Sequence, residues 1–385
     1  MRNIKSVLFL LVLSAFFFSC SDGNKDEANS TSYSFEVVDS VLVDYLGNMN
    51  LQDYDPKSSK YLLTNDVYFD YLEIDESGNI LNHSEFSEEG SNPISSPMGL
   101  GYFDGKVTVF DSPKGYFSFE DSAIVSEVLI PYSSQVFMMY PKLGMFELDG
   151  KVFYPKPWPE TLKVSFSEGA FYKALMKLDI LESQDKDTGD TLGYVKLPED
   201  SPLLGEGIQG FPIPTYTLTS DKLLLSMWLE PRFYVYSIKN GNFEFEKTVE
   251  IDIPGWVPYT PVPEGNPDAF FVENQKKTTG NLTNLFQIGD KYIAIYNKGL
   301  TEDQMAALDR QDPNFESERR RKNPHLVAVF DKEFNQLASN VPIPVPASYN
   351  TVLNNKDELV VSKDPSLTEV EDDGIMIYKL KLVEK

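Results

Sequence analysis

From Tyr33 onward, the chain consists of short segments in which apolar and polar residues alternate. These segments are rich in Val, Ile, Tyr, Phe and Thr, and residues typical of turns, namely Gly, Asn, Asp and Pro, separate them. An alternation of period two places every second side chain on the same face, so it predicts β-strands rather than helices. We therefore expect an all-β body.

One pattern recurs along this body: a tight polar turn, then a charged residue, then an apolar strand. A clear copy is Leu148-Asp149-Gly150-Lys151-Val152, and a second hairpin follows most copies. Successive charged residues are separated by 46, 45, 71, 69 and 67 residues. They are Lys60, Lys106, Lys151, Lys222, Lys291 and Glu358.

Four antiparallel strands in each unit predict the blade of a β-propeller. One twisted sheet cannot bury both of its faces, whereas radial stacking buries them and leaves only short edges exposed. The six copies predict a single six-bladed β-propeller domain over residues 33–385, with four-stranded antiparallel blades. The last unit ends too early for four strands, so we expect the strand at residues 34–43 to close the ring. The alternative is a pair of β-sandwich domains divided near residue 200.

The N-terminus has a different pattern. Arg2 and Lys5 precede the apolar run 7–18, which is too short to span a bilayer but typical of a signal peptide. The run ends at Ser19-Cys20, and a small residue directly before the only Cys resembles the lipobox of bacterial lipoproteins. The resemblance implies a signal peptide over residues 1–19 and a lipid on Cys20, although Phe stands where the family usually has Leu. An ordinary secretory signal is the alternative.

Residues 20–32 are small, polar and acidic, which is typical of a flexible tether. An acidic stretch after the lipidated Cys resembles the surface-export signal of Bacteroidota lipoproteins. No later segment approaches 18 consecutive apolar residues, so we expect a soluble body held by lipid. The expected location is the outer membrane of the cell envelope, on its periplasmic or its exposed face.

The segment from Lys291 to Gly299, together with the six-unit architecture, resembles a known group of proteins. It is a Bacteroidota lipoprotein family of unknown function whose body is a TolB-like six-bladed propeller. The resemblance implies the fold and the anchor, but it brings no catalytic residues.

Composition excludes several kinds of function. The net charge is -25, and such an acidic chain is a poor candidate for binding nucleic acid. One Cys and two His exclude a disulfide framework and a Cys-rich metal site. No P-loop, dinucleotide or nucleophile-elbow motif is present, so we expect no cofactor and predict no catalytic residue. Asp185, Asp187 and Asp190 alternate like the start of a calcium loop, but the later ligands are missing, which makes them weak metal candidates.

The spacing of the copies predicts that the fourth to sixth blades carry long insertions, and loops often carry function. The insertion at residues 253–281 contains Trp256 and Tyr259. Aromatic rings on such a loop can stack on a sugar or contact a partner. The alternative is that Trp256 and Phe270 pack the loop onto the blade.

A further insertion, in the fifth blade, is predicted to be helical. Thr301 and Gln304 form a capping box, and the only dense basic cluster of the chain follows. Arginine binds carboxylate or phosphate groups through two parallel hydrogen bonds, so this cluster can hold an anion or an acidic glycan. Its alternative role is to pair with Glu316 and Glu318. The candidate binding residues here are Arg319, Arg320, Arg321, Lys322 and His325.

These observations predict a lipid-anchored, monomeric binding module that presents its insertion loops to a protein or a glycan. Whether the protein is an enzyme stays open: the alternative is a glycan hydrolase or lyase with its site in the central funnel, and a third possibility is a structural role. Carboxylates roughly 5–9 Å apart in the funnel would favour the enzyme.

Overall fold

A computed structural model of the chain describes residues 32–90, 93–135, 141–159, 169–211, 213–368 and 373–385. The predicted signal peptide, Cys20 and nearly all of the predicted tether lie outside these residues. Tyr33–Glu384 form one compact unit. Within the described part of the chain, no helix is long and apolar enough to cross a membrane.

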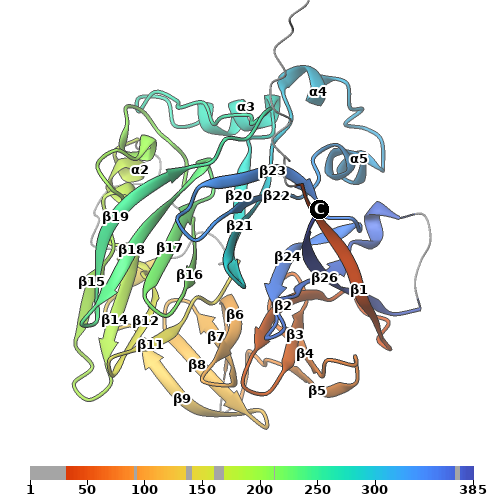
Figure 1. Ribbon diagram of the computed structural model, residues 1–385. Helices are drawn as coiled ribbons and strands as arrows, with labels where there is room; N and C mark the ends of the chain where they lie inside the picture. Colours follow the sequence, from red (N-terminus) through yellow and green to blue (C-terminus); the bar gives the residue numbers. More distant parts are fainter. Residues whose placement is uncertain (1–31, 91–92, 136–140, 160–168, 212, 369–372) are drawn as a thin grey trace, which may run out of the picture. The chain divides into compact units, whose positions relative to one another are not determined.

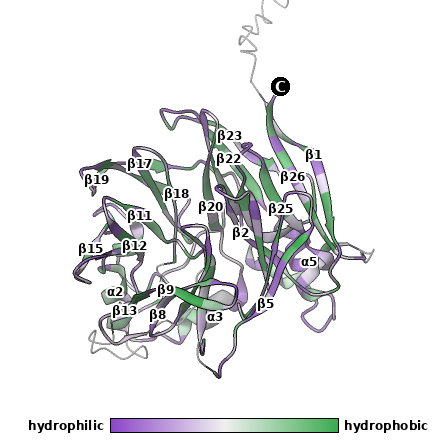
Figure 2. Cartoon of the chain, turned by 90° about the horizontal axis from the view of Figure 1, so that it is seen from below, coloured by the Kyte–Doolittle hydropathy of each residue, from purple (hydrophilic) through white to green (hydrophobic). Residues whose placement is uncertain are grey.

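This unit is a six-bladed β-propeller (Figures 1 and 2). Its described residues form six four-stranded antiparallel sheets, which confirms the predicted fold and makes the two-sandwich alternative wrong. In five blades the lysine of the recurring pattern begins the second strand, and in the sixth Glu358 directly precedes it. The recurring turn therefore marks the hairpin between the first two strands of every blade.

The first three blades follow one another along the chain, and in blades 1 and 2 the outermost strand is more exposed than the three strands inside it. Blade 1 contains β2 (Asn50–Asp55), β3 (Lys60–Thr64), β4 (Asp70–Ile74) and β5 (Ile80–Glu85). Blade 2 contains β6 (Pro97–Phe103), β7 (Lys106–Asp111), β8 (Gly115–Glu120) and β9 (Ala123–Leu129). Blade 3 contains β11 (Phe146–Leu148), β12 (Lys151–Pro155), β14 (Leu181–Asp185) and β15 (Thr191–Tyr194). A two-stranded ribbon beside it pairs β10 (Ser134–Gln135) with β13 (Trp158–Pro159).

The last three blades complete the ring. Blade 4 contains β16 (Pro214–Leu218), β17 (Lys222–Met227), β18 (Arg232–Lys239) and β19 (Asn242–Glu250). Blade 5 contains β20 (Asn281–Ile288), β21 (Lys291–Asn297), β22 (Leu326–Phe330) and β23 (Gln336–Pro342). Blade 6 contains β24 (Ala347–Leu353), β25 (Leu359–Lys363), β26 (Ile375–Glu384) and β1 (Tyr33–Val43).

The N-terminal strand β1 is the outer strand of the sixth blade, as predicted. It pairs antiparallel with β26, from Tyr33 opposite Glu384 to Val43 opposite Ile375. In Figure 1 these two strands lie side by side, β1 in red and β26 in dark blue. Hydrogen bonds between the first and last strands therefore close the ring.

Hydrophobic clusters hold neighbouring blades together. The described residues form one such cluster at each of the six contacts between blades. The contact between blades 6 and 1 contains fully buried Val43, Leu51 and Val360. Strands in Figure 2 carry hydrophobic and hydrophilic residues along the same strand, consistent with the alternation in the sequence. Burial between all neighbouring sheets is what makes the closed ring stable.

The insertions do not lie quite where the spacing of the copies placed them. Extra residues occur in blade 3, in the connection from blade 4 to blade 5, and in blade 5, rather than in blades four to six. The recurring turn lies between the first two strands of a blade. A long interval between two turns therefore indicates residues inserted after the first of them, either in the same blade or in the connection to the next one. Their helices are α2 (Gly169–Met176), α3 (Ala269–Lys276), α4 (Glu302–Ala306) and α5 (Phe315–Lys322), with short 3-10 turns η3 (Pro202–Leu204) and η4 (Pro365–Leu367).

Only the helices of blade 5 were predicted. The capping box of α4 is present, because the Thr301 side chain accepts from the Gln304 backbone N–H and the Gln304 side chain accepts from the Thr301 backbone N–H. Helix α2 instead joins two loops in a satellite cluster that includes Phe171, Ile208 and Val262. The insertions are thus packed structures of their own.

Candidate functional site

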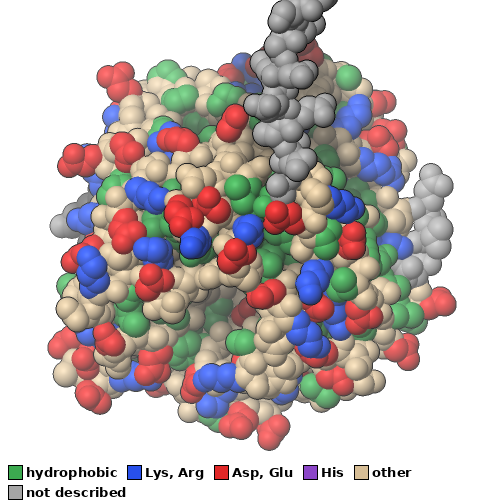
Figure 3. Space-filling model, viewed as in Figure 1, with side chains coloured by type: hydrophobic (Ala, Val, Ile, Leu, Met, Phe, Trp, Pro, Cys, Tyr) green, Lys and Arg blue, Asp and Glu red, His purple; other side chains and the backbone are tan. Residues whose placement is uncertain are grey.

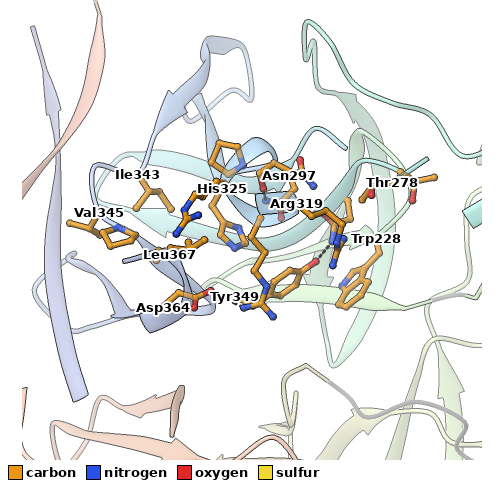
Figure 4. A pocket seen from close by; sticks show the side chains of 18 of the residues that line it. Trp228, Thr278, Asn297, Arg319, His325, Ile343, Val345, Tyr349, Asp364 and Leu367 are labelled. Atoms are coloured by element: carbon orange, nitrogen blue, oxygen red, sulfur yellow. Dashed lines mark hydrogen bonds and ion pairs between the residues drawn. The ribbon is translucent and has the colours of Figure 1, made fainter. Parts of the chain in front are cut away.

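A pocket of about 530 Å³ opens among blades 4, 5 and 6, beside α5 and η4 (Figure 4). Its walls come from the starts of β20 and β24 and from residues just beyond the ends of β17 and β25. It therefore lies at the mouth of the propeller where the first strand of each blade begins. We call it the insertion-face pocket.

Four of the predicted binding residues line this pocket and three do not. Arg319, Arg320, Arg321 and His325 belong to the lining, whereas Lys322, Trp256 and Tyr259 are absent from it. The arginines form the last turn of α5, where the partial negative charge of a helix C-terminus favours cations. The sequence thus placed the basic cluster and the histidine at one site.

Each arginine also pairs with a carboxylate. Arg319 Nη2 lies 2.6 Å from Glu316 Oε2, and Arg321 Nη1 lies 2.5 Å from Glu318 Oε1. Arg320 Nη1 donates to Asp364 Oδ2 at 2.8 Å, and Asp364 also caps η4 through Ser366. The pairing that the sequence offered as an alternative is present, and the same three side chains still line the pocket.

His325 lies in the middle of the pocket, edge-on to Tyr349. Their ring centroids are 5.2 Å apart and their planes are inclined by 79°. Burial lowers the pKa of His325 to about 4; the charge of Arg320 also lowers it and that of Asp364 opposes the shift. The imidazole is therefore neutral at neutral pH, and its Nδ1 is buried with no hydrogen-bond partner among the described residues.

Several lining residues were missed by the sequence analysis. Trp228 Nε1 and Asn297 Oδ1 are buried and, within the described structure, have no hydrogen-bond partner. Tyr349 accepts a hydrogen bond from Asn281 Nδ2, and its ring lies 6.4 Å from that of Trp228. No local motif marks these residues, because they come from three blades that only the folded propeller brings together.

The two aromatic candidates of the 253–281 insertion pack into the protein instead. Trp256 packs edge-on against Tyr296, with ring centroids 6.5 Å apart, and its indole covers Gly280. The Tyr259 hydroxyl donates to the Ile208 carbonyl oxygen at 3.1 Å. This placement agrees with the packing alternative.

The aspartates at 185–190 form a hairpin turn. Asp185 Oδ1 accepts the backbone N–H groups of Asp187 and Thr188, and the Thr188 hydroxyl donates to Asp190 Oδ2. Across the described ranges, no group of three or more His, Cys, Asp or Glu side chains is arranged to hold a metal ion.

A second pocket, of about 700 Å³, lies at the opposite mouth of the propeller, where the first strands of the blades end. We call it the central pocket. Asp53 lies in this pocket, and burial raises the pKa of Asp53 against the opposing charge of Lys142. Lys142 Nζ donates to the carbonyl oxygens of Gln52 and Thr351, and burial lowers the pKa of Lys142 to about 8. Lys142 therefore links blades 1 and 6 through hydrogen bonds to the backbone of both.

The other acids of this central pocket are also engaged. Asp55 accepts the backbone N–H of Ser58, Asp104 pairs with Lys57 at 2.7 Å, and Glu147 pairs with Lys186 at 2.5 Å. Asp53 itself accepts the backbone N–H groups of Tyr54 and Tyr102. These contacts give the carboxylates structural partners at turns and between strands.

No family model and no curated protein matches the sequence. Solved structures do match. A member of the DUF4221 family from Bacteroides vulgatus has a TM-score of 0.60 at 12% identity, covering 92% of this chain and 99% of that one. A Bacteroides fragilis protein provisionally described as exported has a TM-score of 0.49 at 12% identity, covering 95% and 98%. Streptogramin B lyase has a TM-score of 0.43 at 11% identity, covering 91% and 98%.

At these identities the likeness shows the fold alone. The propeller expected from the sequence is confirmed, and similar structures include a member of a family of unknown function from Bacteroides. The lipid anchor and the TolB-like subdivision are not decided by this likeness.

Proposed function

We propose that the protein is a lipid-anchored binding module of the cell envelope, with its binding site in the insertion-face pocket. The anchor is inferred from Cys20 and the apolar run before it. The propeller is a rigid ring, and it supports a site built from three neighbouring blades. Such a pocket, largely apolar with a few converging polar groups, is the usual form of a small-molecule site.

One observation carries the proposal. Trp228 Nε1, Asn297 Oδ1 and His325 Nδ1 are buried around a single pocket and have no hydrogen-bond partner among the described residues. Leaving a buried polar group without a partner costs about 1–3 kcal/mol. Three such groups at one site are therefore expected where a bound molecule completes their hydrogen bonds.

The experiment is recovery of the bound species. Full-length protein is cross-linked in intact cells, purified, and analysed by mass spectrometry for proteins and small molecules. We expect a recurring species with the wild type that is lost from the Trp228→Ala/His325→Ala double variant. His83→Ala is the matched control, since His83 lies on the outer strand β5 and pairs with Asp70 away from the pocket. Equal recovery from all three proteins would contradict the proposal.

The second candidate, a glycan hydrolase or lyase in the central pocket, is supported by the half-buried acid Asp53, whose pKa is raised. It ranks second because the acids there already have structural partners. A loss of glycan-cleaving activity in Asp53→Asn, with unchanged thermal unfolding, would favour it.

A further inference from the structure

We infer that the insertion-face pocket takes an amphipathic organic carboxylate, with its acid group on the arginines of α5 and its apolar body against Ile343, Val345 and Leu367. The inference rests on the proposed function and names the chemical class of ligand for the same site.

The first argument is charge. Three arginines and one acid, Asp364, line the pocket, whereas the whole chain has a net charge of -25. Figure 3 shows Lys and Arg intermixed with Asp and Glu on the face in view, so a cavity with an excess of cations is a local exception. Because such a site attracts negative charge, the ligand is an anion.

The second argument is the availability of the arginines. Glu316 and Glu318, the partners of Arg319 and Arg321, have side chains that are 61% and 42% exposed. Ion pairs this exposed are worth only about 0–1 kcal/mol, so a ligand can replace them at little cost. Arg320 is bonded through Nη1 to Asp364, and a guanidinium has further N–H donors for a carboxylate.

The third argument is the apolar end. Ile343, Val345 and Leu367 lie together at one end of the pocket, and Trp228 and Thr278 lie at the other (Figure 4). A fully hydroxylated sugar acid would leave the apolar end without a matching surface. Inorganic phosphate is far smaller than a cavity of about 530 Å³.

Aromatic rings extend from the middle of the pocket to the end at Trp228. The rings of His325, Tyr349 and Trp228 follow one another across the pocket, as the labelled side chains of Figure 4 show. Aromatic faces and edges favour a flat organic body. The indole N–H of Trp228 and the amide oxygen of Asn297 then offer a donor and an acceptor to a polar substituent.

The test uses probes that separate charge from shape. Phenylacetate, its neutral isostere 2-phenylacetamide, the cation phenethylamine, glucuronate and inorganic phosphate are titrated into full-length protein by saturation-transfer or ³¹P NMR. We expect phenylacetate to bind at least about tenfold more tightly than the amide, because a charged hydrogen-bond pair is worth roughly 1.5–3 kcal/mol. Glucuronate, phosphate and phenethylamine are expected to bind more weakly still.

Variants locate the binding. Arg320→Gln should weaken phenylacetate binding about tenfold. Lys322→Gln removes the same charge from the same helix but lies outside the pocket lining, so it should change the affinity less than about twofold. Trp228→Phe keeps a ring and removes the N–H, and it serves as a second pocket variant if Arg320→Gln unfolds.

The other outcomes separate the two proposals. Equal binding of phenylacetate and its amide, or tighter binding of glucuronate, overturns the carboxylate class while the site itself survives. Binding of no probe, with a species still recovered from cells, likewise overturns only this inference. Binding of no probe together with no recovered species overturns both.

Discussion

His325 is a residue whose protonation opposes folding. Its pKa lies near 4 in the folded protein because of burial, against about 6.5 in an unfolded chain. The unfolded state therefore binds more protons between these values, and the histidine destabilises the fold as the pH drops from 6.5 towards 4.

We predict that His325→Gln flattens this part of the pH profile. Between pH 7.5 and 4.5 the wild type should lose about 2–3 kcal/mol more unfolding free energy than the variant. Urea unfolding at the two pH values gives the comparison. Parallel profiles for wild type and His325→Gln would refute the buried, neutral histidine.

Gly280 is required by the ring of Trp256. A Cβ atom at residue 280 would lie 2.6 Å from the indole, whereas one at Gly265 would meet nothing within 4 Å. We predict that Gly280→Ala lowers the unfolding free energy by about 1–3 kcal/mol through overpacking. Gly265→Ala should change it by less than about 0.5 kcal/mol, as is usual for exposed positions. Urea denaturation measures both, and a neutral Gly280→Ala would mean that Trp256 is not fixed against the blade.

For single residues, the sequence predicted where the charges cluster better than it predicted which side chains meet in the fold. Arg319, Arg320 and Arg321 could be recognised because basic residues are rarely adjacent in an acidic chain. Trp228, Asn297 and Tyr349 could not, since each is an ordinary strand-end or strand residue until three blades meet. The sequence left two roles open for Trp256, because an aromatic residue in a loop has the same local pattern whether it packs inward or outward.

The strand β1 is the element that closes the ring. Val43 on this strand is fully buried against blades 1 and 6, whereas its neighbour Leu42 is 48% exposed. We predict that Val43→Ala lowers the unfolding free energy by about 2 kcal/mol and Leu42→Ala by less than about 0.5 kcal/mol. Chemical denaturation of the full chain tests this, and equal effects of the two variants would argue against closure by β1.

Elements were predictable where the chain repeats itself. The six turns define strand order and blade number, and the Thr301 capping box marks α4. Helices α2 and α3, each of 8 residues, were missed. Asp268, the N-cap of α3, makes no side-chain capping hydrogen bond, so the cap does not stabilise the start of that helix. Such helices depend on packing rather than on local propensity.

For the whole molecule, the anchor is the property that the N-terminal pattern predicts and the described residues leave untested. We predict that Cys20→Ser abolishes metabolic labelling with palmitate and moves the protein from the membrane fraction to the soluble fraction of lysed cells. Ser21→Ala keeps the thiol and should behave as the wild type. Labelling that persists in Cys20→Ser would exclude lipidation at this residue.

The two mouths of the propeller represent the two functional hypotheses. The insertion-face pocket combines cations, aromatic rings and buried polar atoms that have no hydrogen-bond partner in the described part of the chain. The central pocket contains acids that already serve turns and strands. The sequence did not decide between a binding site at the insertion loops and an enzyme site in the central funnel. Which polar groups have hydrogen-bond partners is determined only when the propeller folds.

The most direct measurement is a crystal structure of the protein soaked with a diverse library of small organic fragments. The account predicts that bound fragments gather in the insertion-face pocket, in contact with Trp228, His325 and Tyr349. Fragments gathered in the central pocket around Asp53 and Lys142, with the insertion-face pocket holding only solvent, would contradict it.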